Sequence, residues 1–128
     1  MTRFVISPAA FASVPEHNDR ERRVQLVELD VKKIDSAWRL QGRFNGYVGA
    51  NGEGGKPSKY LGVQSWLEYN DEIYVPILLL DFTRAPEKFR FENGRHTFAY
   101  FRDRGHPAMP FGIPSEVSEI FKTYFGVA

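Results

Sequence analysis

Residues 89–105 read FRFENGRHTFAYFRDRG, and this stretch decides how the rest of the chain is interpreted. Its first residues alternate between apolar and charged side chains, which is typical of a strand. The Asn93-Gly94 dipeptide that follows favours a tight turn. From Thr97 onward the apolar side chains can share one face of a short helix, which Gly105 would end. The stretch therefore predicts a strand, a turn and a helix.

Polar side chains crowd the predicted turn. A helix N-terminus presents unpaired N–H groups and a partial positive charge, yet the neighbouring Arg95 and His96 are basic. A bound anion would remove this mismatch, because the N–H groups, the guanidinium and the imidazole can all contact it, and Gly94 would let a phosphate approach the backbone. The alternative is that Glu92 neutralises Arg95 and that His96 caps the strand. The residues alone leave both interpretations open.

The first interpretation defines a candidate site at the turn. Its candidate phosphate- or nucleotide-binding residues are Asn93, Gly94, Arg95, His96 and Thr97. Glu92 and His96 are the candidate catalytic residues, because a carboxylate and an imidazole that face one cleft can act as an acid–base pair. Glu92 is also the candidate ligand of a divalent metal ion. If the site is catalytic, the expected reaction is metal-assisted phosphoester hydrolysis.

Composition limits the class of protein. A chain of 128 residues, 42% hydrophobic and 26% charged, is long enough for one domain with its own core. The absence of cysteine excludes disulfides, thiolate nucleophiles and cysteine zinc sites. No apolar run reaches the about 18 residues of a membrane span, and so we expect a cytoplasmic protein with no membrane partner. A net charge of +1 is low for a protein that grips duplex DNA, so any nucleic-acid role would depend on a local patch.

The remaining segments predict further strands and helices. Alternating or continuous apolar residues favour strands at residues 3–7, 24–31, 44–48, 73–80 and 109–113. Helical periodicity favours helices at residues 58–69, with Ser58 as the cap, and from Pro114 to near the end of the chain. Asp35 is expected to begin a polar break. Together these elements predict a single domain of the α+β class.

Two polar segments have ordinary explanations. The glycine-rich residues 49–55 lack the spacing of a phosphate-binding P-loop and lead into Lys56-Pro57, so we expect a flexible hairpin tip or a lid. The mixed charges of residues 16–23 are typical of a solvated loop or helix face. Arg102 and Arg104 suit the negative end of the predicted helix dipole and need no functional explanation.

The same residues resemble the signature of the ParB/sulfiredoxin-like superfamily. The shared pattern is F-x-F-x-N-G-R-H-x-F-A-x-x-R-D-x-G-x-x-x-M-P-F, which begins at Phe89. Residues 24–30 resemble the first strand of that domain. The chain is most similar to the plasmid fertility-inhibition factor group, and the shared features are Trp38, Tyr47-Val48, Asn93-Gly94-Arg95-His96 and Arg102-Asp103. The likeness covers residues 24–126 and leaves residues 1–23 as an N-terminal extension.

This resemblance implies a compact α+β domain, with a mixed sheet flanked by about three helices and a nucleotide pocket lined by the Asn93–His96 turn. Relatives in the superfamily bind ATP or CTP, and some have ATPase or DNase activity, so Mg²⁺ is an expected cofactor. Fertility-inhibition members block the transfer of a co-resident plasmid. The resemblance therefore implies a small mobile-element protein with a nucleotide or nucleic-acid phosphate pocket and weak metal-assisted ATPase or DNase activity.

The chain departs from the family pattern at important positions. Sulfiredoxins have a cysteine where this chain has Arg95, so the chain is not expected to be a sulfiredoxin. Most relatives have a second arginine where this chain has Thr97, which weakens the expected phosphate binding. The length also argues against the DNA-binding domains of a partition protein. Two other functions stay open, namely a non-catalytic module that binds a conjugation or defence protein, and an accessory protein of a mobile gene pool with another anionic ligand.

Overall fold

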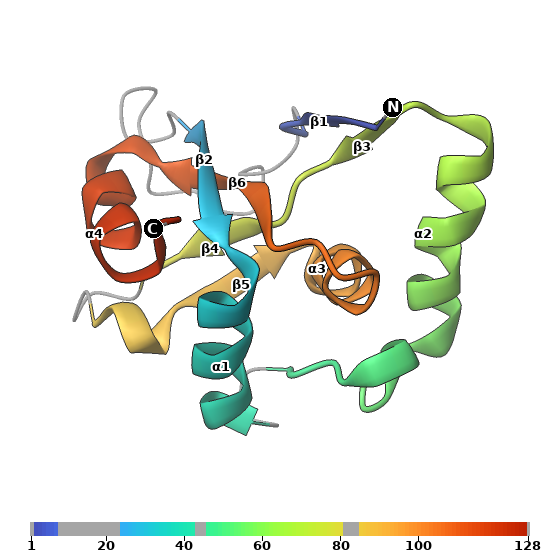
Figure 1. The fold of residues 1–128 in the computed structure, drawn as a ribbon, viewed down its shortest axis with the longest axis horizontal. Helices are drawn as coiled ribbons and strands as arrows, with labels where there is room; N and C mark the ends of the chain where they lie inside the picture. Colours follow the sequence, from blue (N-terminus) through green and yellow to red (C-terminus); the bar gives the residue numbers. More distant parts are fainter. Residues whose placement is uncertain (1, 8–23, 43–45, 81–84, 128) are drawn as a thin grey trace.

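The computed structural model describes residues 2–7, 24–42, 46–80 and 85–127 (Figure 1). The strands are β1 (Arg3–Val5), β2 (Val24–Asp30), β3 (Glu72–Tyr74), β4 (Ile77–Leu79), β5 (Arg90–Asn93) and β6 (Ala108–Pro114). The helices are α1 (Val31–Gln41), α2 (Pro57–Tyr69), α3 (Arg95–Asp103) and α4 (Ser118–Phe125). Short 3-10 turns are η2 (Ala50–Gly52), η3 (Pro86–Lys88) and η4 (Ser115–Val117). The predicted α+β class is confirmed, and residues 16–23 lie outside the described residues.

The main sheet is mixed and has the strand order β2-β6-β4-β5. Strand β6 pairs antiparallel with β2 and parallel with β4, and β4 pairs antiparallel with β5. A separate parallel pair joins β1 to β3. Figure 1 shows α3 between the main sheet and α2, with α4 on the other side of the molecule near β2. The N-terminus of α3 is therefore flanked by α2, and this places the predicted site between two helices.

The apolar residues 73–80 do not form the single strand that the sequence predicts. They divide into β3 and β4 at Pro76, which has no backbone N–H group to donate to a neighbouring strand. Val75, one residue beyond the end of β3, still donates its N–H to the carbonyl of Val5 in β1, at 2.8 Å, whereas the Pro76 carbonyl accepts from Gly112 of β6, at 2.9 Å. The segment thus passes from one sheet to the other at the proline.

Residues 31–41 form helix α1, so the polar break predicted at Asp35 is wrong. The side chain of Asp30 caps the helix by accepting a hydrogen bond from the N–H of Lys33, at 2.9 Å. Apolar side chains at helical spacing face the core and are fully or nearly fully buried, namely Val31, Ile34 and Trp38. The strand predicted at residues 44–48 is also wrong where the structure describes it, because residues 46–48 are not in a strand.

Helix boundaries differ from the predicted ones by small amounts. Helix α2 begins at Pro57 with Lys56 as its N-cap residue, so Ser58 lies inside the helix and does not cap it. Helix α3 begins at Arg95, before the predicted start at Thr97. The C-terminal helix is preceded by η4, and its buried residues include the predicted Phe121 and Phe125. Proline fixes φ at the first turn of α2, and glycine permits the left-handed conformation from which α3 begins at Arg95.

Aromatic rings form the centre of the core. Phe98 of α3 is fully buried and its ring lies 5.7 Å from Trp38 of α1, 5.6 Å from Phe91 of β5 and 5.7 Å from Phe111 of β6. Aromatic pairs at such separations add to the burial of apolar surface. Phe98 therefore fixes α3 to the sheet and to α1 at the point where the candidate site begins.

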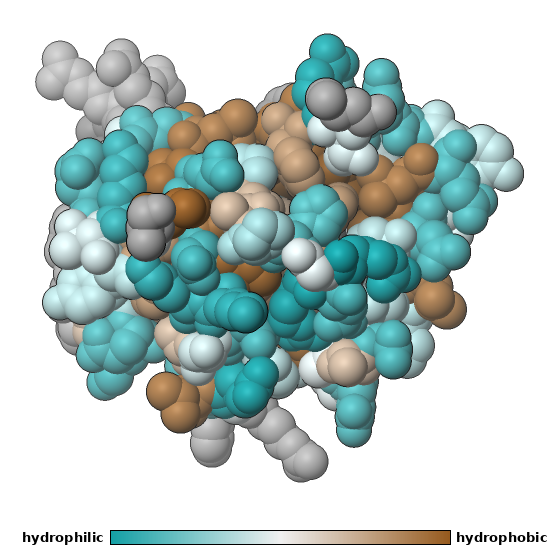
Figure 2. All heavy atoms as spheres, viewed as in Figure 1, coloured by the Kyte–Doolittle hydropathy of each residue, from teal (hydrophilic) through white to brown (hydrophobic). Residues whose placement is uncertain are grey.

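The surface carries separate apolar side chains. Figure 2 shows hydrophilic residues over most of the face that Figure 1 presents, with smaller hydrophobic areas between them. Among the described residues, none of the helices combines the length and hydrophobicity that a bilayer-spanning segment needs.

Replacing Gly62 with alanine is expected to stabilise the protein by about 0.5–1 kcal/mol. Gly62 lies inside α2, and a Cβ added there would meet nothing within 4 Å. The gain arises because alanine loses less conformational freedom than glycine when the helix forms. Urea denaturation of Gly62→Ala and the wild type measures the difference in stability. A less stable variant would contradict the prediction, because it would mean that the added methyl group has no room on this face of α2.

Candidate functional site

The N-terminus of α3 is left without a cap from any side chain. Gly94 is the N-cap residue, adopts the left-handed conformation (φ 83°, ψ 14°) and offers no capping side chain. The first hydrogen bond of the helix runs from the N–H of Phe98 to the Gly94 carbonyl, at 2.9 Å. The N–H groups of Arg95, His96 and Thr97 consequently have no partner within the helix. No acidic residue occupies the first turn, so the positive end of the helix dipole is not neutralised there.

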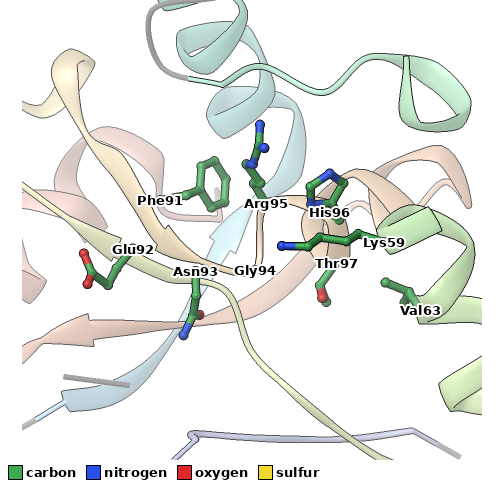
Figure 3. Close-up of a pocket in the computed structure, with 9 residues that line it drawn as sticks. All are labelled: Lys59, Val63, Phe91, Glu92, Asn93, Gly94, Arg95, His96 and Thr97. Carbon is green, nitrogen blue, oxygen red and sulfur yellow. The ribbon is translucent and has the colours of Figure 1, made fainter. Parts of the chain in front are cut away.

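This helix end opens into a pocket of about 400 Å³ (Figure 3). The predicted site residues 92–97 all line it. Helix α2 adds Lys59 and Val63, and β5 adds Phe91. Figure 3 shows the Lys59 ammonium extending toward the Gly94 turn. The pocket therefore combines free backbone donors, a flexible cation and two apolar walls, within the size range of small-ligand sites.

Arg95 is directed toward the loop before η2. Its Nη1 donates to the carbonyl oxygen of Gly46, at 2.8 Å, and Figure 3 shows its side chain pointing away from Thr97. Glu92 forms an ion pair with Arg90, at 3.1 Å. Arg95 thus adds positive charge to the pocket while part of its guanidinium holds the loop.

His96 is buried, with only 7% of its surface exposed. Its Nε2 accepts a hydrogen bond from the N–H of Lys56, at 2.9 Å, so this nitrogen carries no proton. Burial lowers the pKa of His96, and the nearby positive charges of Arg95, Lys59 and Lys56 lower it further. The imidazole is therefore neutral at pH 7 and holds the start of α2.

The structure does not orient Glu92 and His96 as an acid–base pair. The two side chains point to different sides of the turn in Figure 3, with the Glu92 carboxylate beside Arg90 and the imidazole beside Lys56. Within the described ranges, no group of three or more His, Asp or Glu side chains is arranged to hold a metal ion.

A buried ion-pair network at the C-terminal end of α3 was not expected from the sequence. Arg102 is 12% exposed in its side chain and pairs with Asp35 of α1, at 3.0 Å. The same Nη1 donates to the Val48 carbonyl, at 2.6 Å, and Nε donates to the neighbouring Asp103, at 3.0 Å. The sequence interpretation of Arg102 as a simple dipole partner is therefore incomplete. Arg104 does fit a surface role, because its guanidinium lies over the Tyr100 ring, at 4.2 Å.

Asp103 extends this network to the glycine-rich loop. Its Oδ2 accepts from the Tyr60 hydroxyl, at 2.6 Å, and from the N–H of Asn51, at 2.9 Å. Burial raises the pKa of Asp103, but these two hydrogen bonds and the charge of Arg102 outweigh it and lower the pKa overall. The loop is therefore not the flexible hairpin tip that the glycines predict. It contains η2, and its backbone is fastened to α3.

Sequence reasoning also missed Lys59 as a pocket residue. Lys59 precedes Val63 by one helical turn, so the two lie on neighbouring positions of α2, and both line the pocket. This spacing was visible in the sequence. What it could not show is that α2 lies beside the N-terminus of α3.

No family model, curated protein or solved structure matches this chain.

Proposed function

We propose that the pocket at the N-terminus of α3 binds the phosphate group of a nucleotide or a nucleic acid. The observation that carries the proposal is the uncapped first turn of α3, whose free N–H groups and lack of acidic residues meet Lys59 across the pocket. A phosphate accepts hydrogen bonds from such N–H groups and complements the helix dipole.

The expected affinity follows from these contacts. An anion at a helix N-terminus gains about 0.3–2 kcal/mol, and a hydrogen bond to a charged group contributes about 1.5–3 kcal/mol. Their sum corresponds to a dissociation constant of order millimolar for inorganic phosphate. Phe91 and Val63 offer apolar surface to the rest of a nucleotide, so ATP or CTP should bind more tightly than phosphate alone.

The proposal extends to family membership. We propose that the chain is a ParB/sulfiredoxin-like protein of the plasmid fertility-inhibition group, acting on a nucleotide or nucleic acid. What supports this is that the motif residues Asn93, Gly94, Arg95 and His96 lie at the pocket. Lys59 supplies a cation where Thr97 replaces the arginine of most relatives. Binding is favoured over ATPase or DNase activity, because neither Glu92 nor His96 is oriented as a catalytic base.

A second candidate function is a protein-binding module, for example for a conjugation component. It is favoured by the outward face of α2, where Leu61, Trp66 and Tyr69 are 58%, 49% and 85% exposed. Large exposed apolar side chains on one helix are typical of interaction surfaces. This module would not require an occupied pocket.

Thermal unfolding with added phosphate, ATP or CTP, each with and without Mg²⁺, tests the phosphate proposal. A ligand at ten times its dissociation constant stabilises the folded state by about 1.4 kcal/mol, which raises Tm by several degrees for a domain of this size. We expect Lys59→Ala to weaken binding about tenfold, because one charge-assisted hydrogen bond is lost. Lys122→Ala, on α4, is the matched control and should bind like the wild type.

Three outcomes separate the candidates. A rise in Tm for nucleotides that Lys59→Ala reduces supports the phosphate site. A rise for other small anions with no preference for phosphate favours a different anionic ligand. No rise with millimolar nucleotide in wild-type protein contradicts the proposal and leaves the α2 surface as the better candidate.

A further inference from the structure

Residues 46–56 form a strap that is fastened to α3 at four points. Arg95 and Arg102 hold the carbonyls of Gly46 and Val48 near one end, Asp103 holds the middle, and His96 holds the other end. Each contact uses a backbone group of the strap, so none depends on the identity of a strap side chain. The strap leads directly into α2, whose N-cap residue is Lys56.

The four contacts differ in how they respond to pH. Arginine stays protonated in proteins, and the pKa of Asp103 lies below its ordinary value, so the two arginine contacts and the Asp103 contact do not change between pH 5 and 8. His96 is the one of the four whose side chain gains a proton as the pH falls below the ordinary histidine range, since its pKa is lowered by burial and nearby cations. Its Nε2 can accept the hydrogen bond from Lys56 only while it has no proton.

We infer that the strap is a proton-sensitive latch: protonation of His96 releases the Lys56 end of the strap from α3, while the Arg95 and Asp103 contacts keep the remainder in place. Protonation would place an N–H of the imidazolium against the N–H of Lys56. Two donors cannot share a hydrogen bond, so the contact is lost and repulsion replaces it.

The surroundings of His96 oppose its protonated form. The charged groups that act on the imidazole are Arg95 on its own helix and Lys56 and Lys59 at the start of α2, and all are cations. The positive end of the α3 dipole adds to them. An imidazolium formed here consequently has cations on both sides of the contact, which disfavours it. The hydrogen bond to Lys56 therefore persists until the pH falls below the ordinary histidine pKa of about 6.5.

The strap has no room to adjust while it remains closed. A Cβ added at Gly55 would lie 2.8 Å from Nε2 of His96 and 2.9 Å from Cγ2 of Val48. Gly55 therefore packs closely against Nε2 of His96 and leaves no space for a side chain there. When the hydrogen bond is lost, the strap end has to move away from α3, because the ring is held between the strap and the core.

The latch does not require the phosphate proposal, since all of its contacts lie within the chain. It has a consequence for the pocket, because Lys59 lies in the first turn of the helix that begins where the strap ends. Release of the strap end would therefore make the position of the Lys59 ammonium, which faces the N-terminus of α3, less well fixed.

Amide hydrogen exchange and histidine NMR on the intact chain, without ligand, test the latch between pH 8 and 5. We expect His96 to titrate with a midpoint below 6.5, and the protection factor of the Lys56 amide to fall about tenfold through the same midpoint, as one hydrogen bond is lost. The Asn51 amide should keep its protection, because Asp103 remains ionised. Correction for the intrinsic pH dependence of exchange makes the two amides comparable.

Two variants isolate the imidazole. His96→Gln keeps a neutral acceptor that does not titrate, so its Lys56 protection should be independent of pH, whereas His106→Gln, at an exposed turn position, should behave like the wild type. Gly55→Ala should show low Lys56 protection at every pH, because the new Cβ overlaps the ring. The latch is contradicted if wild-type Lys56 stays protected while His96 titrates, or if His96→Gln loses protection in parallel with the wild type.

Discussion

Arg102→Met is expected to lower the free energy of unfolding by about 1.5–3 kcal/mol, because it removes charge-assisted hydrogen bonds to two buried carboxylates, which keep Arg39 and Tyr60 as partners. Methionine matches the aliphatic stem of arginine, so the packing around the stem is largely kept. The loss would come from Asp35 and Asp103, which both pair with this guanidinium. Urea denaturation at pH 7, followed by circular dichroism, measures it.

Arg104→Met is the matched control for this prediction. Arg104 is close in sequence, carries the same charge and lies on the surface over the Tyr100 ring. A cation–π contact at an exposed site contributes about 0.5–1 kcal/mol, so this variant should lose no more than that. Similar losses for the two variants would show that the buried network does not stabilise the fold beyond an ordinary surface charge.

Arg102 and Arg104 have the same side chain, but Arg102 lies in the buried network and Arg104 lies on the surface. Arg102 holds α1 through Asp35 and the strap through the Val48 carbonyl, so its loss would loosen the strap as well as the core. Arg102→Met is therefore expected to lower the protection of the Asn51 amide, which hydrogen-bonds to Asp103. Arg104→Met should leave that amide unchanged.

The strand, turn and helix at residues 89–105 could be predicted because their signals are local. Alternation specifies β5, the Asn93-Gly94 dipeptide specifies the turn, and the following residues specify α3. The predicted site residues lie together for the same reason, since neighbours in a tight turn stay neighbours in space. Local signals also identified β2 and β6.

Features that depend on distant partners could not be predicted in the same way. Asp35 was predicted to begin a polar break, whereas its carboxylate lies inside α1, where it pairs with Arg39 one turn later and also with Arg102, which is distant in sequence. Residues 73–80 looked like one strand because their division depends on pairing with β1 and β6. Lys59 reaches the pocket only because α2 packs beside α3. In each case the deciding contact lies far away in the chain.

Gly94→Ala is expected to destabilise the protein and to weaken phosphate binding together. Gly94 has a φ of 83°, and a Cβ there would lie 2.6 Å from Cα of Pro76. The left-handed conformation alone costs about 1–3 kcal/mol for a residue with a side chain, and the overlap with the Pro76 backbone adds to this cost. The Pro76 backbone, between β3 and β4, cannot yield as a flexible side chain would, so the turn itself has to shift.

Gly105→Ala separates the two causes. Gly105 has a φ of 82°, and an added Cβ there would meet nothing within 4 Å. This control therefore carries the cost of the left-handed conformation without a clash, and it lies at the far end of α3 from the pocket. Urea denaturation and phosphate titration of both variants should show the larger loss of stability in Gly94→Ala and a loss of phosphate affinity in that variant alone. Equal losses in both properties would mean that the approach of Gly94 to Pro76 does not position the N-terminus of α3. A loss of stability without a loss of affinity would mean that the N–H groups of the first turn are not what holds the phosphate.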